Sequence, residues 1–276
     1  QLIQAFHDAG LPQGVANLVY GEPAEISAYL IPHPIVRKIS FTGSTPVGKQ
    51  LAALAGQHMK KATMELGGHA PVLIFKDADL DVAVKEILAA KFRNAGQVCI
   101  APTRFLIERD VYDEVITKIK AQVEALKVGN GLDAGTDMGP MIHARSYANI
   151  QKMIKNALDH GAQLVCGGQA LEGEGYFMQP TVLKDVPLGA DCMHNEPFGP
   201  LVLCNPFDDY AEAIQEANRL EFGLAAYAYS RSNKTCLDLG RDIQSGMLTI
   251  NHIGLGLPEL PFGGLKDSGY GTEGGS

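Results

Sequence analysis

The sequence lacks several features that would assign a protein to a class at once. No apolar run approaches the roughly 20 residues that a membrane-spanning helix needs, and the first residues do not resemble a signal peptide. Basic residues are not in excess: 31 Asp and Glu outnumber 23 Lys and Arg, which gives a formal net charge of −8. Nucleic acids and anionic membrane surfaces bind to basic faces. We therefore expect no nucleic-acid partner and no membrane partner.

Closely spaced cysteine pairs are also missing. The five cysteines are scattered along the chain, and no two have the spacing of a zinc ribbon or a redox motif. This pattern predicts no metal site and favours a reduced, cytoplasmic compartment. Four of the five are expected to pack as small hydrophobic residues.

Length and composition predict a globular α/β protein. With 276 residues, of which 46% are hydrophobic and 20% charged, the chain can form one large or two medium domains. Helical and extended patterns alternate, which predicts a parallel sheet with crossover helices. Residues 15–20 are predicted as an early strand, and 260–269 as a structured loop. The chain has no starting Met and opens inside a helical pattern, so we expect a fragment.

One short segment, Asn94–Cys99, is the strongest candidate for chemistry. It follows an amphipathic run that ends near Phe92 and precedes a strand pattern at Thr103–Ile107. Loops held by a rigid scaffold often carry catalytic residues. A lone cysteine in such a loop suggests that Cys99 is a covalent nucleophile.

Two further segments have more than one interpretation from their residues alone. Phe41–Gly48 reads as a strand, a glycine turn and a helix start, which is either a phosphate site or only a well-capped helix. It is not the three-glycine dinucleotide fingerprint. Glu65 ends a strand before Gly67-Gly68, and its carboxylate is either solvated or held in a pocket. The residues alone favour the solvated alternative.

Five segments together resemble one family. They occur in the family's order with consistent spacing: Phe41–Gly48, Glu65–Gly68, Gly96–Cys99, Glu196–Pro200 and Pro261–Gly271. The chain resembles NAD(P)-dependent aldehyde dehydrogenases over essentially every residue, particularly the succinate-semialdehyde dehydrogenase-like branch. The resemblance implies an aldehyde dehydrogenase-like α/β fold with three parts. These are a partial Rossmann-like cofactor domain over 1–67, an α/β catalytic domain over 68–260 and a return segment over 261–276.

The resemblance also implies roles for single residues. Cys99 matches the nucleophile and Glu65 the general base, which reverses the solvated interpretation of Glu65. The residues matched to the binding of NAD or NADP are Phe41, Gly43, Ser44, Leu66, Glu196 and Phe198. His252 falls where the family lines its substrate entrance. Arg104 matches a structural position more closely than a substrate ligand.

The implied activity is oxidation of a small aldehyde, such as succinate semialdehyde, to the acid with NAD or NADP. It would proceed through a thiohemiacetal and a thioester on Cys99, with Glu65 assisting hydrolysis. The implied assembly of the full-length protein is a homodimer or homotetramer. Ser27 departs from the family, whose members often have Gly there.

Two alternatives stay open. A CoA-acylating aldehyde dehydrogenase is disfavoured because that class typically lacks the base that Glu65 matches. A truncated, non-catalytic domain is the other alternative, because the family's oxyanion Asn and cofactor-binding Lys fall upstream of Gln1. The chain alone is therefore expected to show little or no NAD-linked turnover, whereas a version extended N-terminally is expected to be active.

Overall fold

The computed structural model describes residues 1–275, which form two compact units. One unit comprises residues 1–39 and 49–62, and the other comprises residues 40–48 and the chain from residue 63 onward. The three domain ranges suggested by the family resemblance stay predictions.

The smaller unit is mainly helical. Its helices are α1 (Leu2–Asp8), α2 (Pro23–Leu30) and the larger part of α3 (Thr45–Gln57), and β1 (Lys38–Thr42) and β2 (Lys61–Glu65) begin in it. Pro23 is the first residue of α2, where its missing N–H costs no helical hydrogen bond. Lys60 Nζ donates to the carbonyl oxygens of His33 at 2.9 Å and Val36 at 2.7 Å, which holds the turn after α3 against this segment.

The prediction of a strand over residues 15–20 was wrong. This segment has no strand, and Val15, Leu18, Val19 and Tyr20 are exposed. A short apolar run becomes a strand only when a neighbouring strand pairs with its backbone groups. Here no partner strand is present among the described residues.

A seven-stranded sheet dominates the larger unit and confirms the predicted parallel sheet. Its strands, in spatial order, are β10 (Met247–Ile250), β9 (Ala225–Tyr229), β3 (Ala70–Ile74), β4 (Pro102–Glu108), β7 (Leu201–Phe207), β6 (Thr181–Lys184) and β5 (Gln163–Cys166). All neighbours pair in parallel except β5 and β6, which are antiparallel. Parallel strands buried on both faces read as continuous apolar runs, and β3 is buried at every position.

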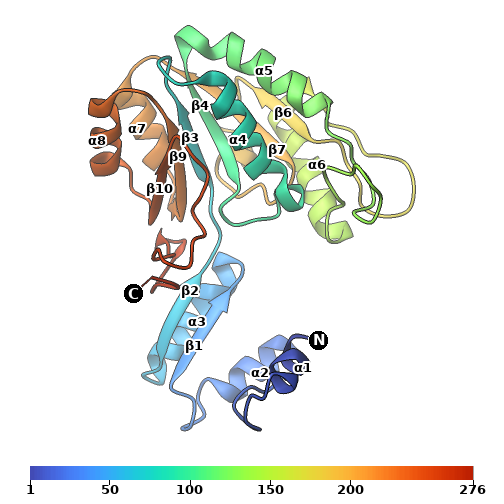
Figure 1. Cartoon of the computed structure of the whole chain (residues 1–276), viewed down its shortest axis with the longest axis vertical. Helices are drawn as coiled ribbons and strands as arrows, with labels where there is room; N and C mark the ends of the chain where they lie inside the picture. Colours follow the sequence, from blue (N-terminus) through green and yellow to red (C-terminus); the bar gives the residue numbers. More distant parts are fainter. Residues whose placement is uncertain (276) are drawn as a thin grey trace. The chain divides into compact units, whose positions relative to one another are not determined.

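Helices cover both faces of this sheet (Figure 1). The first face carries α4 (Leu80–Phe92), α5 (Tyr112–Glu124) and α6 (Ala144–Asp159), and the second carries α7 (Tyr210–Asn218) and α8 (Asn233–Asp242). Side chains alternate along a strand. Accordingly, Val72 and Ile74 join the core under α4 to α6, whereas Leu73 packs into the core under α7 and α8.

The C-terminal segment returns to β2. The predicted loop at 260–269 instead contains β11 (Leu265–Lys266), which pairs with β8 (Phe222–Gly223), and leads into β12 (Gly269–Tyr270). In β12, Gly269 pairs with Glu65 of β2. Gly269 has φ +120°, and a Cβ there would lie 1.8 Å from the Met64 carbonyl oxygen. Only glycine therefore permits this close pairing beside Glu65.

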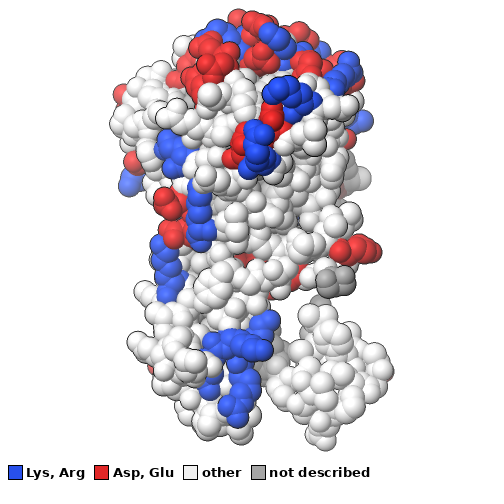
Figure 2. Space-filling model, turned by 90° about the vertical axis from the view of Figure 1, so that its left-hand side faces the viewer, with Lys and Arg blue, Asp and Glu red and all other residues white. Residues whose placement is uncertain are grey.

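The surface around α8 carries charges of both signs (Figure 2). Arg241 pairs with Asp238 and Asp242, and Lys234 also pairs with Asp238. Mixed charges of this kind create no extended basic field. No helix in residues 1–275 is both long and apolar enough to cross a membrane.

Candidate active site

The loop that carries Cys99 begins where α4 ends. The short helix η1 (Arg93–Gly96) follows Phe92, and Asn94 and Ala95 adopt left-handed backbone angles with φ 51° and 53°. Such conformations cost roughly 1–2 kcal/mol per non-glycine residue. Gly96 has φ +72°, and a Cβ there would lie 2.2 Å from the Gly199 carbonyl oxygen. The chain is therefore turned sharply and pressed against the segment that carries Glu196.

Gln97 fixes this turn from within. Its Nε2 donates to the carbonyl oxygens of Asn94 at 3.1 Å and Pro140 at 3.3 Å. Its Oε1 accepts from the backbone N–H of Ile142 at 2.9 Å. The buried amide thus ties the Cys99 loop to the segment before α6, which positions the thiol without contacting it.

The Cys99 thiol is partly buried, and burial is the largest influence that raises its pKa. The negative charge of Glu196, and to a smaller extent that of Glu65, raises the pKa further, whereas the backbone N–H groups of Cys99 and Ile100 lower it. The thiol is therefore mainly protonated at neutral pH. It needs a base to become the nucleophilic thiolate.

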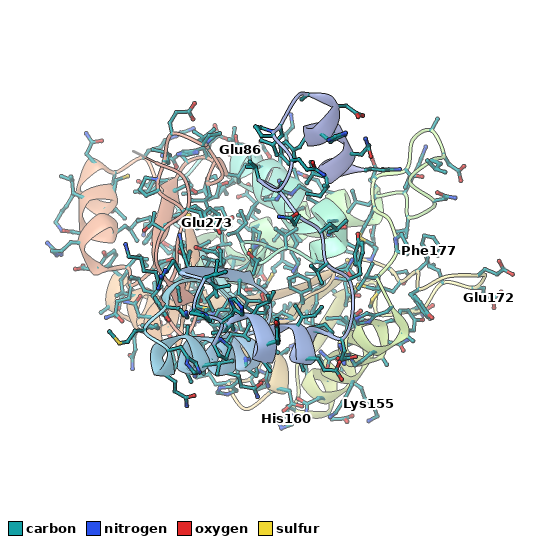
Figure 3. The ribbon with its side chains drawn as sticks, turned by 90° about the horizontal axis from the view of Figure 1, so that it is seen from below. Glu86, Lys155, His160, Glu172, Phe177 and Glu273 are labelled. Atoms are coloured by element: carbon teal, nitrogen blue, oxygen red, sulfur yellow. The ribbon has the colours of Figure 1, made fainter. Side chains whose placement is uncertain are left out.

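Glu65 stands at the end of β2 and is 2% exposed. Neither carboxylate oxygen has a hydrogen-bond partner among the residues the structure describes. Burial, followed by the charge of Glu273, raises the pKa of Glu65 to about 7. Glu273, labelled in Figure 3, itself accepts a hydrogen bond from Ser40 Oγ at 3.2 Å. A buried carboxyl that titrates near neutrality suits a general base.

Glu196 is held by the glycine pair that follows Glu65. The backbone N–H of Gly68 donates to Glu196 Oε1 at 3.0 Å. A Cβ on Gly67 would lie 2.7 Å from Glu196 Oε2. Burial raises the pKa of Glu196 to about 7, and the Gly68 N–H and the charge of Lys91 oppose that rise. The two glycines therefore let a carboxylate approach the backbone closely.

The turn between β1 and α3 also lines the site. Gly43 donates its N–H to the Glu65 carbonyl oxygen at 3.1 Å. A Cβ on Gly43 would lie 2.5 Å from the ring of Phe41, which covers this glycine. The first turn of α3 presents free N–H groups, which attract anions such as phosphates. Gly48 brings α3 against Leu66, because a Cβ there would lie 2.2 Å from Leu66 Cδ2.

One cavity of about 750 Å³ joins these elements. The residues predicted for chemistry, Cys99 and Glu65, both line it. So do five of the six residues matched to the cofactor: Gly43, Ser44, Leu66, Glu196 and Phe198. The structure thus brings together groups from β2, the η1 loop, the turn before α3 and the turn after η3 (Asp191–Met193).

Three residues considered from the sequence do not line this cavity. Phe41 packs on Gly43 instead. His252 is exposed, and its Nδ1 accepts from the Gly254 N–H at 3.1 Å, so its place at a substrate entrance stays a prediction. Arg104 is 1% exposed and donates to the carbonyl oxygens of His69, Glu216 and Ala217, which is a structural role.

The first turns of α6 were not predicted to line the site. His143, Arg145, Ser146 and Asn149 line the same cavity as Cys99. His143 caps α6, since its Nδ1 accepts from the Ser146 N–H at 3.0 Å. A cap marks where a helix starts, but it does not show what the first turn faces. No group of three or more His, Cys, Asp or Glu in residues 1–275 could hold a metal ion.

Comparisons with known proteins give one family. The model of the aldehyde dehydrogenase family matches residues 1–276. The chain is 47% identical over 266 residues to 4-(hydroxymethyl)benzenesulfonate dehydrogenase of Comamonas testosteroni, covering 96% of this chain and 55% of that protein. It is 45% identical over 266 residues to the NADP(+) succinate-semialdehyde dehydrogenase of Escherichia coli K12, with the same coverage.

Solved structures agree with this result. An NADP-dependent enzyme of Escherichia coli superposes with a TM-score of 0.97 at 43% identity, covering 99% of this chain and 57% of that chain. The predicted α/β fold of this family is therefore confirmed. The chain spans a little over half the length of the relatives it matches.

Proposed function

The chain belongs to the aldehyde dehydrogenase family, and from this premise we propose that it carries the catalytic groups for oxidising a small anionic aldehyde to the acid with NAD or NADP. The observation that carries the proposal is the shared cavity of Cys99 and Glu65, in which the carboxylate has no hydrogen-bond partner within residues 1–275. Succinate semialdehyde is the substrate we favour. One relative is named for that compound and another for a sulfonate, so an anionic end is the property their substrates share.

The first step belongs to Cys99. A base accepts the thiol proton, and the sulfur forms a bond to the aldehyde carbon. The carbonyl π electrons move onto oxygen, which gives a thiohemiacetal oxyanion. Donors aimed at such an oxyanion are typically worth about 2.7–4 kcal/mol each. The backbone N–H groups of Cys99 and Ile100 favour negative charge on the Cys99 sulfur, so they assist formation of the thiolate that attacks the aldehyde.

Several other residues that line the cavity fit a nicotinamide cofactor. Gly43 and Ser44 precede the N-terminus of α3, which suits a diphosphate. Glu196 offers a carboxylate to ribose hydroxyls, and Phe198 also lines the cavity. Gly67 leaves room there that a Cβ would fill. When bound, the cofactor accepts the hydride that leaves the thiohemiacetal carbon.

Glu65 completes the cycle. The product of hydride loss is a thioester on Cys99, and water must attack it. Glu65 takes a proton from that water as the carbon–oxygen bond forms. Cys99 then leaves as a thiolate and the acid is released. Aldehyde, oxidised cofactor and water thus give acid, reduced cofactor and a proton.

The test is an assay of the full-length protein with succinate semialdehyde and each cofactor, with CoA present or absent. We expect reduced cofactor and free succinate in equal amounts, with or without CoA, and no turnover by Cys99→Ala. Cys236→Ala, the other partly exposed cysteine, is the matched control and should retain full activity. Butanal, which has the same carbon count and no charge, should react less efficiently.

Two outcomes would count against the proposal. Succinyl-CoA as the main product would favour the CoA-acylating alternative. Absence of turnover by the full-length protein with Cys99 intact would favour the non-catalytic alternative. A cytoplasmic location and a homodimeric or homotetrameric assembly stay predictions.

A further inference from the structure

Lys91 is an unusual residue of the larger unit. It belongs to the last turn of α4, its side chain is 0% exposed, and its Nζ has no hydrogen-bond partner among residues 1–275. Lysine is almost never fully buried unless it is paired. An isolated ammonium in an apolar interior is among the most costly groups a protein can bury. An opposite charge nearby would offset that cost.

Lys91 packs next to the loop that carries Cys99. A Cβ on Gly96 would lie 3.2 Å from the Lys91 carbonyl oxygen and 2.2 Å from the Gly199 carbonyl oxygen. The end of α4, the Cys99 loop and the turn that carries Glu196 therefore form one tightly packed group. Glu196 is the charged group that acts on Lys91, and Lys91 in turn favours the ionised form of Glu196.

Two other titratable groups, His69 and Cys99, interact with this pair. His69 lies within the influence of Lys91, but burial holds the pKa of His69 well below its usual value, so it is neutral. Its ring nitrogens contact Thr103 Oγ1 at 2.7 Å and the Cys192 carbonyl oxygen at 2.9 Å. On the cavity side, Glu196 acts on the Cys99 thiol. Neither His69 nor Cys99 supplies negative charge to Lys91 at neutral pH.

We propose that Lys91 is a positioning residue that acts through Glu196, holding its carboxylate ionised and in place to accept hydrogen bonds from the cofactor ribose. This rests on the proposed function, which assigns Glu196 to the ribose. An ionised carboxylate can accept from two hydroxyls at once, whereas a protonated one must use one oxygen as a donor. A cation behind the carboxylate favours the ionised form without occupying the cavity.

The sign of the pH effect follows from the charges. Removing the Lys91 charge raises the pKa of Glu196, because burial is then opposed only by the Gly68 N–H. Less Glu196 is ionised at pH 6.5–7, so cofactor binding weakens there. Well above this range Glu196 ionises without help, and Lys91 itself loses its proton because burial lowers its pKa. The effect of Lys91 therefore fades as the pH rises.

The first experiment measures whether the two residues are coupled, and it needs no catalysis. Urea unfolding is followed for the unaltered chain, Lys91→Met, Glu196→Gln and the double variant. We expect the two single variants' losses in unfolding free energy to sum to more than the loss of the double variant. The difference should correspond to a coupling of at least fivefold in the unfolding equilibrium constant. Additive losses would overturn the pairing, since residues that do not interact give additive effects.

The second experiment measures the function of the pair. Binding of NADH and NADPH is followed by nicotinamide fluorescence between pH 6 and pH 9. We expect Lys91→Met to weaken binding about tenfold at pH 6.5, since one pKa unit corresponds to tenfold, and to match the unaltered chain near pH 9. In the Glu196→Gln background, Lys91→Met should have no further effect. Lys155→Met, on the exposed face of α6 (Figure 3), is the matched control and should bind normally.

The outcomes separate the inference from the proposed function. A loss of binding by the same factor at every pH would show only a packing role for Lys91 and overturn the inference, while the proposed function stands. Failure of the unaltered chain to bind either cofactor would overturn both the proposed function and the positioning role. The unfolding experiment would still decide whether Lys91 and Glu196 are paired.

Discussion

Glu65 illustrates how one residue combines a catalytic use with a structural cost. Its carboxyl is buried without a hydrogen-bond partner among the described residues, and its pKa is raised to about 7. Such a site disfavours the charged form on which base catalysis depends. The same surroundings keep the base close to the pH at which it works, which is how active sites commonly tune carboxyl groups.

The first prediction concerns the pH dependence of thioester hydrolysis. Glu65 acts as a base only when ionised, so the steady-state rate should rise as pH increases through about 7. Glu65→Gln should lower that rate by roughly 10²–10⁴-fold and remove the dependence. Rapid-mixing measurements should still show one equivalent of reduced cofactor, because Cys99 is intact. A variant that loses the first turnover as well would contradict a role confined to hydrolysis.

The second prediction concerns stability. The pKa of Glu65 rises from an ordinary value of 4.5 to about 7 on folding. The unfolded chain therefore ionises Glu65 more readily, and the free energy of unfolding decreases as pH rises through this interval. Glu65→Gln should therefore leave stability nearly unchanged at pH 4.5 and increase it by roughly 1–3 kcal/mol at pH 8, since each pKa unit corresponds to about 1.4 kcal/mol. Urea unfolding at the two pH values measures this.

Glu172→Gln is the control for that measurement. Glu172 lies in an exposed loop (Figure 3), and its replacement should shift neither unfolding curve. Equal effects of Glu65→Gln on the free energy of unfolding at pH 4.5 and pH 8 would contradict the prediction. They would mean that ionisation of Glu65 does not cause the destabilisation.

At the scale of elements, the C-terminal return segment holds β2 in place. Ser268 is 0% exposed. Its Oγ donates to the Gly67 carbonyl oxygen at 2.7 Å and accepts from the Gly223 N–H at 3.0 Å. Its carbonyl oxygen accepts from the Leu66 N–H at 3.0 Å. One serine therefore links the strand end after Glu65 to β8.

The third prediction tests that link. Ser268→Ala leaves two buried backbone groups without their partner, so we expect a loss of about 1–3 kcal/mol in the free energy of unfolding. Ser27→Ala is the matched control, since Ser27 Oγ donates to the Pro23 carbonyl oxygen on the surface of α2. Alanine favours helix there, so that variant should be neutral or slightly more stable. Similar losses for both variants would exclude a special role for Ser268.

The elements that were predicted well are those with local signals. The amphipathic run that ends near Phe92 corresponds to α4, and the strand pattern at Thr103–Ile107 corresponds to β4, because regular apolar spacing is a local signal. The short strands β11 and β12 were missed, because two-residue pairings depend on distant partners such as Glu65 and not on periodicity. The predicted strand at 15–20 failed for the converse reason: its apolar pattern has no partner strand in the described chain.

At the scale of the whole molecule, residue types indicated the chemistry, but the tertiary fold determines which of these residues line the same cavity. Cys99 was recognisable from its loop, whereas Glu65 looked solvated until the family resemblance was considered. Its burial depends on β12, which lies some 200 positions later in the chain, as the 201-residue separation of Ser268 from Gly67 shows. The orphan ammonium of Lys91 has no sequence signal, because a lysine at the end of a helix is usually solvated.

The last prediction compares all five cysteines. Cys166, Cys192 and Cys204 are buried, and burial raises the pKa of each. Cys99 and Cys236 are partly exposed. Because the thiolate is the reactive form, we expect iodoacetamide to label only these two under native conditions, as read by peptide mass spectrometry. Labelling of Cys99 should accelerate as pH rises, because its own pKa is raised.

Cofactor binding should distinguish the labelling of Cys99 from that of Cys236. Cys99 lines the cavity with Glu196 and Phe198, whereas Cys236 belongs to α8 on the other side of the sheet, where its Sγ contacts the Ser230 carbonyl oxygen at 3.8 Å. Saturating NADP should therefore change the labelling rate of Cys99 at least severalfold and leave that of Cys236 unchanged. Equal changes at both thiols would indicate a global effect on the fold. No change at either would argue that the cavity beside Cys99 does not bind the cofactor.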